Sequence, residues 1–110
     1  MTIHQKIIKT LDGINNIILT RQEILSMILK KYPDTNKDSI TIQDFCYNRI
    51  NKGSRKNPVF EFCHNGKYVY LGENYLYTGD IYWHKNKIGC WDNGKKTIFK
   101  SHLQIIKNNP

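Results

Sequence analysis

The sequence has little that would place it in a membrane or outside a cell. No hydrophobic run approaches the ~20 residues that a membrane-spanning helix requires, and the N-terminus lacks the pattern of a signal peptide. The three cysteines, Cys46, Cys63 and Cys90, are odd in number and widely spaced, which does not suit a disulfide scaffold. We therefore expect a protein of the reducing cytoplasm, without a membrane partner.

The sequence also lacks the short motifs of common enzymes and metal sites. It has no glycine-rich phosphate-binding loop and no G-x-S-x-G motif, and its acidic residues are scattered rather than clustered as a Mg²⁺-dependent nuclease needs. It contains no Cys-x-x-Cys or His-x-x-x-His pair, one of which structural zinc sites generally show. We expect no catalytic activity, no bound metal and no cofactor.

Positive charge is what the chain has in excess. Seventeen lysines and arginines against nine acidic residues give a net charge of +8, which favours polyanionic partners such as nucleic acid. Residues 49–70 contain five basic residues and a single acidic one, Glu61. Residues 85–110 contain six lysines and a single acidic residue, Asp92. A phosphate-binding surface would be distributed in this way, although the C-terminal lysines are also consistent with a solubilising role.

Three helices are predicted in the first half. Residues 2–11 carry apolar side chains at helical spacing, and Thr20 with Glu23 forms a capping box that opens a second helix, which Pro33 ends. Residues 16–20 between them predict a brief strand. In the run TIQDFCYNRINKG, residues 41–53, the spacing of Ile42, Phe45, Cys46, Arg49 and Ile50 predicts a third helix.

After residue 58 the apolar period changes to two, which is typical of strands. VFEFC and KYVYLG flank His64-Asn65-Gly66, and a second Asn-Gly lies at 93–94; Asn-Gly between alternating runs predicts a β-hairpin. The order of elements predicts one α+β domain over 1–110, a winged helix-turn-helix. Its three helices and wing hairpin would occupy 1–72, and a β-hairpin or small sheet 73–110.

A winged helix places its third helix in the major groove and its wing along the DNA backbone. Asn and Gln can pair with adenine and Arg with guanine, so a polar helix face suits base contacts, although it also suits a solvated surface. The basic loop after this helix and the wing would contact phosphates. The predicted DNA-binding residues are Gln43, Tyr47, Asn48, Arg49, Asn51, Lys52, Arg55, Lys56, His64, Asn65 and Lys67.

The runs DFCYNRINKG, GKYVYLGENYLYTGDIYW and IGCWDNGK resemble a winged-helix-like domain associated with bacterial restriction endonucleases, often fused to HNH-type nuclease modules, and with stand-alone phage proteins. The resemblance rests mainly on Tyr47, Asn48, Arg49 and the stretch 70–79. It implies a module that recognises double-stranded DNA without a cleavage centre, in the cytoplasm of a bacterial cell or a phage-infected host. No nuclease module follows within these 110 residues.

The same features are compatible with an interaction protein. A basic phage protein of this size can inhibit a host nuclease or a CRISPR effector by binding it through the basic surface, as an anti-restriction or anti-CRISPR protein. Both functions need a positive surface with hydrogen-bonding groups, so the sequence leaves them open, together with homodimer formation.

Overall fold

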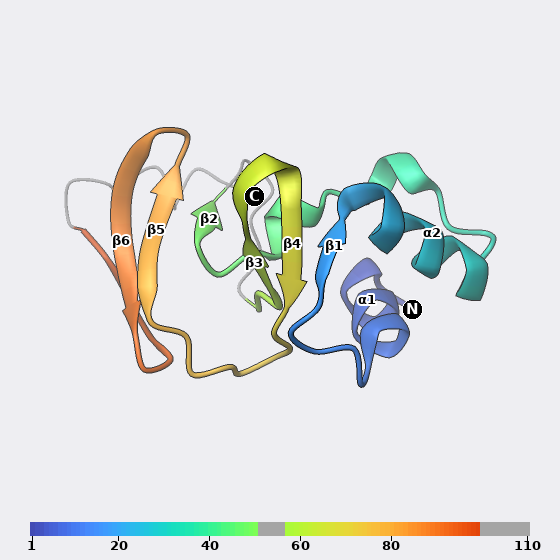
Figure 1. Cartoon of the computed structure of the whole chain (residues 1–110), viewed down its shortest axis with the longest axis horizontal. Coiled ribbons are helices and arrows are strands. Elements are labelled where there is room, and N and C mark those ends of the chain that lie inside the picture. Colours follow the sequence, from blue (N-terminus) through green and yellow to red (C-terminus); the bar gives the residue numbers. More distant parts are fainter. Residues whose placement is uncertain (51–56, 100–110) are drawn as a thin grey trace.

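The computed structural model describes residues 1–50 and 57–99, which fold into two α-helices and two β-sheets. The molecule is elongated, with extents of 42 × 27 × 26 Å. Along its length the helices lie at one end, a three-stranded sheet in the middle and a four-stranded sheet at the other end (Figure 1). We call these sheet A and sheet B.

The two helices, α1 (Ile3–Leu11) and α2 (Arg21–Lys31), begin with the same capping motif. In α2 the Thr20 hydroxyl accepts from the Glu23 amide at 3.1 Å, and the Glu23 carboxylate accepts from the Thr20 amide at 2.8 Å. Thr2 and Gln5 make the equivalent pair of bonds at the start of α1. Both helices turn buried aliphatic side chains toward sheet A, so the two helices predicted near 2–11 and after Thr20 are confirmed.

Sheet A has the strand order β1-β4-β3 and is antiparallel throughout. It consists of β1 (Ile18–Thr20), β3 (Phe60–Phe62) and β4 (Lys67–Tyr70). Asn65 and Gly66, in the turn η3 (His64–Gly66), have φ angles of 62° and 68°, which a tight hairpin turn requires and Asn-Gly tolerates. The hairpin predicted from this dipeptide is confirmed.

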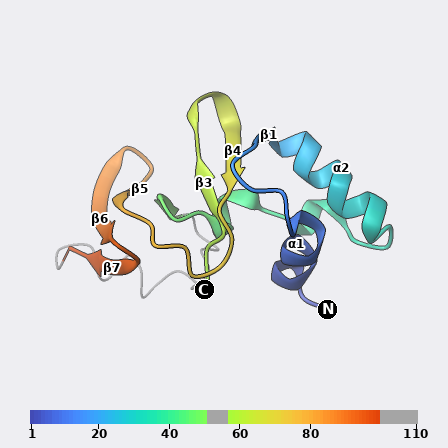
Figure 2. The same cartoon turned by 60° about the horizontal axis from the view of Figure 1, so that its bottom comes forward.

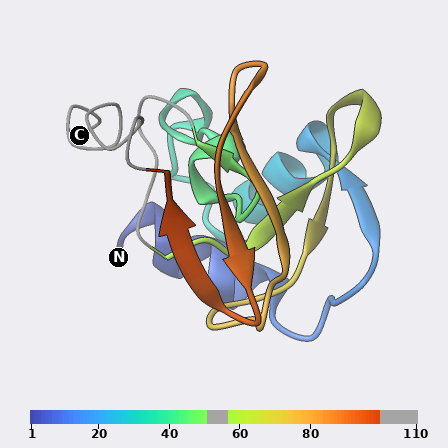
Figure 3. The same cartoon turned by 90° about the vertical axis from the view of Figure 1, so that its left-hand side faces the viewer.

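Sheet B has the order β2-β5-β6-β7, with β2 parallel to β5 and the other pairs antiparallel. Its strands are β2 (Arg49–Ile50), β5 (Gly79–Trp83), β6 (Asn86–Asp92) and β7 (Lys95–Ile98). Figure 3 looks onto the face of this sheet that is turned away from the helices, and Figure 2 shows β7 beside β6 at the outer edge. The small β-sheet predicted after residue 73 is therefore present.

The prediction of a third helix is wrong, and the prediction of a winged helix-turn-helix is therefore wrong as well. Residues Lys37–Ser39 (η1) and Ile42–Phe45 (η2) form short 3₁₀ turns, and the chain then runs extended to Ile50. This extended segment first lies parallel to β3, where Tyr47 donates its amide to the Phe60 carbonyl, and then enters sheet B as β2. The described residues thus hold two α-helices in a mostly β fold.

The physical reason for the error is burial on both sides. Cys46 and Tyr47 are neighbours in an extended segment, so their side chains point in opposite directions, yet both are buried because the segment passes between the two sheets. A strand covered on both faces shows no polar–apolar alternation. Its apolar residues then match a helical spacing by chance over a run this short.

Candidate nucleic-acid interface

Three residues predicted to read bases from a helix instead make hydrogen bonds within the fold, and of the three only Tyr47 is fully buried. Tyr47 is 3% exposed, and its hydroxyl donates to the Gly72 carbonyl at 2.6 Å. Asn48 makes two backbone bonds to Phe62, donating to its carbonyl and accepting from its amide, both at 2.9 Å. Gln43 is half-buried in η2 and is a hydrogen-bond partner of the buried Tyr68 hydroxyl.

Arg49 is the member of that predicted set that reaches a surface groove. Its guanidinium carbon lies 4.3 Å from the centre of the Phe62 ring, an arrangement that stacks the planar cation and holds it in place. The same residue is the register partner of Tyr82 on the adjacent strand β5. Arg49, Tyr82, His84 and Lys85 together line a shallow groove.

Tyr82 and the β5–β6 turn form the other wall of this groove. A β-bulge between Ile81 and Tyr82 shifts the register, and the Tyr82 side chain is 38% exposed. In the turn, His84 has a φ of 55° and its ring packs on Trp83 with centroids 4.5 Å apart. Two cationic side chains and an imidazole thus surround an exposed phenol ring, and no carboxylate is among the described residues that line the groove.

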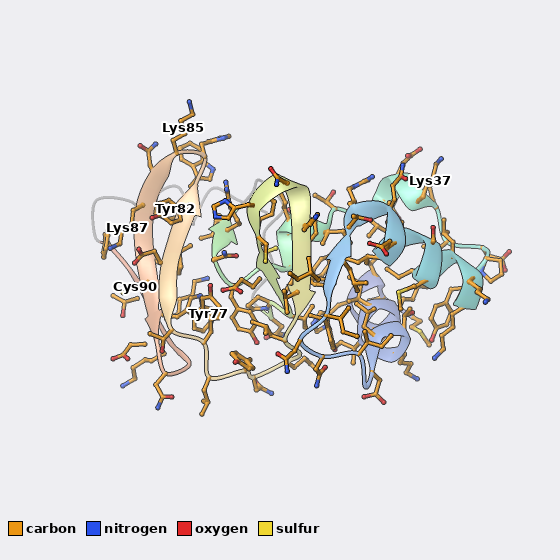
Figure 4. The ribbon with its side chains drawn as sticks, in the orientation of Figure 1. Lys37, Tyr77, Tyr82, Lys85, Lys87 and Cys90 are labelled. Atoms are coloured by element: carbon orange, nitrogen blue, oxygen red, sulfur yellow. The ribbon has the colours of Figure 1, made fainter. Side chains whose placement is uncertain are left out.

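Further basic residues lie along the same edge of the molecule. The β3–β4 turn, the β5–β6 turn and the start of α2 all face one side, which is uppermost in Figure 1. Lys85 points away from the body of the protein at this edge, and Lys37 lies at its other end (Figure 4). Lys67, at the start of β4, and Arg21, at the start of α2, are both exposed.

The predicted tip residues His64 and Asn65 are exposed in the β3–β4 turn on this edge. Lys67 also lies close enough to Glu23 to contribute, after two hydrogen bonds from Thr20, to a lowered pKa of that carboxyl. We call the set Arg21, Arg49, His64, Lys67, Tyr82, His84 and Lys85 the basic edge. The predicted residues Asn51, Lys52, Arg55 and Lys56 lie outside the described part of the chain.

The sequence-based prediction of DNA-binding residues did not include Tyr82, His84 and Lys85, because it placed the base contacts on a third helix at residues 43–51. A signal was present in the run Tyr-Trp-His-Lys, residues 82–85, where two aromatic side chains are followed directly by two basic ones. The β3–β4 turn and the β5–β6 turn are more than fifteen residues apart in sequence and belong to two different sheets. They share one edge because the two sheets are placed with these turns on the same side (Figure 1). That juxtaposition is a property of the tertiary fold.

The described ranges also bear on metal binding, cysteine chemistry and membrane insertion. Within 1–50 and 57–99, no three or more His, Cys, Asp or Glu side chains come together where they would hold a metal ion. The three cysteines are free thiols, and burial raises the pKa of Cys46 strongly. No helix in this part of the chain has the length and apolar character needed to cross a membrane.

The fold and the basic edge define a small, mostly β module with a positively charged, aromatic surface. The chain belongs to a family described as a domain of unknown function, DUF7225, whose model matches residues 2–98. It is also 42% identical over 106 residues to the uncharacterized protein YnaC of Bacillus subtilis (strain 168), covering 89% of this chain. The chain spans about 40% of the length of that relative. No solved structure matches it.

Proposed function

We propose that this chain is a cytoplasmic double-stranded DNA-binding module, without catalytic chemistry of its own, that contacts DNA through the basic edge. The observation that carries the proposal is the groove in which Arg49, His84 and Lys85 surround the exposed Tyr82 ring. Because residues 42–50 form no α-helix, the contact surface is a pair of hairpin turns and not a helix in the major groove.

The chemistry of the groove suits a phosphate backbone. Arg49 can approach a phosphate with its fork of donors while its plane stays on Phe62, and Lys85 extends freely from the turn. Contacts of this kind position a protein on DNA without reading its sequence. Tyr82 adds a ring and a hydroxyl for a sugar or base edge. The second turn, with Lys67, would contact the backbone further along the duplex.

The proposal is tested by the salt dependence of binding. A fluorescein-labelled random duplex is titrated with wild type, Lys85→Ala and Lys67→Ala at several salt concentrations. Each variant should lower the magnitude of the log K versus log salt slope by roughly 1, because one fewer counterion is released per lost phosphate contact. Lys9→Ala, an exposed lysine on α1, is the matched control and should leave the slope unchanged.

Two further variants separate charge from geometry. Arg49→Lys keeps the charge but loses the planar stacking on Phe62, so affinity should fall while the slope stays nearly constant. Tyr82→Leu should weaken binding by an amount that does not change with salt. Equal losses for Lys85→Ala and Lys9→Ala would show non-specific attraction, and absence of binding at low salt would refute the proposal.

A protein partner is the second candidate, either a nuclease or a CRISPR effector that the chain inhibits. The observation in its favour is β1, an edge strand of sheet A, where Ile18 is 60% exposed and Ile17, directly before the strand, is 52% exposed. Edge strands with exposed apolar side chains are places where another chain can add a strand. This candidate predicts that Ile18→Lys abolishes the interaction with the effector while the DNA titrations show no binding.

A further inference from the structure

The outer face of sheet B, which Figure 3 shows, carries two aromatic side chains that point away from the core of the sheet. Ile81 and Ile98 belong to the core side, where Ile81 is fully buried and Ile98 packs against the same cluster. Successive side chains of a strand point to opposite faces, so the next residues along the chain, Tyr82 and Phe99, lie on the outer face. Both are 38% exposed.

A row of side chains crosses this face from one edge of the sheet to the other. Arg49 on β2 is the register partner of Tyr82 on β5, and Tyr82 is the register partner of Lys87 on β6. The Phe99 amide donates to the Ile88 carbonyl at 2.8 Å, which continues the pairing of β6 with β7. The Lys87 ammonium lies 5.9 Å from the centre of the Phe99 ring. The row therefore alternates cation, ring, cation and ring across the sheet.

The charges along this row favour an anionic ligand. Arg49 and Lys87 belong to the row, and Lys85 lies beside it in the β5–β6 turn (Figure 4). The Asp80 carboxylate contacts the Lys87 ammonium at 3.0 Å, and the two side chains are 42% and 47% exposed. An ion pair as exposed as this one contributes little to stability, so a phosphate group can take the place of the carboxylate.

Exposed rings on the face of a sheet suit unpaired nucleic acid bases. In a duplex the neighbouring pairs cover the faces of each base, whereas in a single strand those faces are free to stack on an aromatic side chain. Cations placed between the rings suit the phosphates that link one base to the next. The outer face of sheet B presents both kinds of group to one extended strand.

We propose that the outer face of sheet B binds single-stranded nucleic acid. One base stacks on Tyr82 and another on Phe99, while Arg49 and Lys87 hold phosphates. This function goes beyond the duplex binding proposed above and does not require it. The site shares Arg49 and Tyr82 with the basic edge and adds Lys87 and Phe99, which the duplex proposal does not use. The strand is DNA or RNA, because a stacked base and a phosphate are common to both.

The aromatic contacts are tested with fluorescein-labelled octamers of thymidylate and of uridylate, titrated with the full chain beside a random duplex. Phe99→Leu keeps the apolar bulk but loses the aromatic face. It should weaken binding of the octamers about 5- to 150-fold, the fold-change equivalent of one stacked base, and leave the duplex affinity unchanged. Phe99→Trp should retain octamer binding. Tyr75→Leu, which removes a 45% exposed ring from the loop before β5, is the matched control and should have no effect.

The charges on this face are tested by Lys87→Ala and Asp80→Asn. Lys87→Ala should lower the magnitude of the log K versus log salt slope for the octamers by roughly 0.7, the value for one phosphate of a single strand. It should leave the slope for the duplex unchanged. Asp80→Asn should tighten octamer binding, because it removes the carboxylate that competes with phosphate for the Lys87 ammonium. Lys9→Ala on α1 is the control for lost charge and should leave both slopes unchanged.

Thermal unfolding of each variant checks that it is folded. Absence of octamer binding at low salt would overturn the proposal, as would equal losses for Phe99→Leu and Tyr75→Leu. Binding of the octamers without binding of the duplex would refute the duplex proposal and support this one, and binding of the duplex alone would do the reverse. Tighter binding of the uridylate octamer would assign the face to RNA, and tighter binding of the thymidylate octamer would assign it to DNA.

Discussion

The two ends of this molecule are built on cores of very different size. The helices and sheet A enclose fourteen buried residues, with Phe60 as their largest fully buried member. Sheet B has a core of three, Ile50, Ile81 and Ile88, with Trp83, Trp91 and Ile98 packed against it. Since burial of apolar surface is the main stabilising contribution to folding, the first region should be the more stable of the two.

The position of sheet B therefore depends on the side chains between the regions. Tyr47 stacks on Tyr77 with centroids 5.1 Å apart, and the Tyr77 hydroxyl donates to the Glu61 carboxylate of sheet A at 2.7 Å (Figure 4 labels Tyr77). Trp91 of sheet B bonds to the Tyr47 backbone. A large core can hold one region alone, whereas the smaller region carrying Tyr82 and Lys85 is held by this junction. Ligand-binding elements are commonly drawn from the less stable part of a fold.

The largest expected effect comes from the larger core. Phe60→Ala should lower the free energy of unfolding by about 3–5 kcal/mol, because it removes a fully buried ring and leaves a cavity. Urea unfolding followed by circular dichroism measures this loss. Phe99→Ala, which truncates a ring that is 38% exposed, is the control and should cost far less. Similar losses for the two variants would mean that the core assignment is wrong.

A smaller effect, confined to sheet B, is expected for Gly89→Ala. A Cβ at Gly89 would clash with the Thr97 carbonyl oxygen, so strands β6 and β7 must move apart, at a cost of about 1–3 kcal/mol. Amide hydrogen exchange should quicken in β6 and β7 and stay unchanged in α1 and α2. The control is Cys90→Ala on the same strand. Uniformly faster exchange in all elements would show that the two regions unfold as one unit.

The junction itself is tested by Tyr47→Phe, which should lower the free energy of unfolding by about 1–3 kcal/mol. The ring stays, but the bonds from its hydroxyl to Gly72 and Tyr75 are lost, and each hydrogen bond typically contributes about 0.5–1.5 kcal/mol. Hydrogen exchange should quicken first at the Tyr75 amide. Tyr75→Phe is the matched control, since its ring is 45% exposed. An equal effect of both variants would argue against a special role for the Tyr47 hydroxyl.

The contrast between the regions also explains how far the sequence predicts the fold. Where an element is covered on one side only, its apolar and polar residues alternate at a period that identifies it. Both capped helices and the Asn65-Gly66 hairpin are therefore predicted from local sequence alone. Residues 45–50 are covered on both sides by partners distant in sequence, and there the prediction of a helix failed. Of the basic edge, Arg49, His64 and Lys67 are predicted from the sequence, whereas the groove that joins Arg49 to Tyr82 depends on β2–β5 pairing.

The smallest expected effect concerns the two capping boxes, which differ in one respect. In α2 the third helical residue is Glu23, an acid, and in α1 it is Gln5, which has no charge. The pKa of Glu23 is lowered, chiefly by the hydrogen bond from the Thr20 amide and next by the Thr20 hydroxyl. The folded state therefore prefers the ionised carboxylate. Its contribution to stability is present above the ordinary pKa of Glu and is lost as the pH falls through the lower folded value.

The variants Glu23→Ala and Gln5→Ala test whether the charge of the third helical residue contributes to stability. Urea unfolding of each variant is compared with wild type at neutral pH and at about pH 3, which is below the ordinary pKa of a glutamate. The destabilisation by Glu23→Ala should be larger at neutral pH, because only the ionised side chain interacts with the positive end of the helix dipole as well as with the Thr20 amide. The destabilisation by Gln5→Ala should be the same at both pH values. A cost of Glu23→Ala that does not change with pH would mean that the carboxylate acts only as a neutral hydrogen-bond acceptor, as the Gln5 amide does in α1.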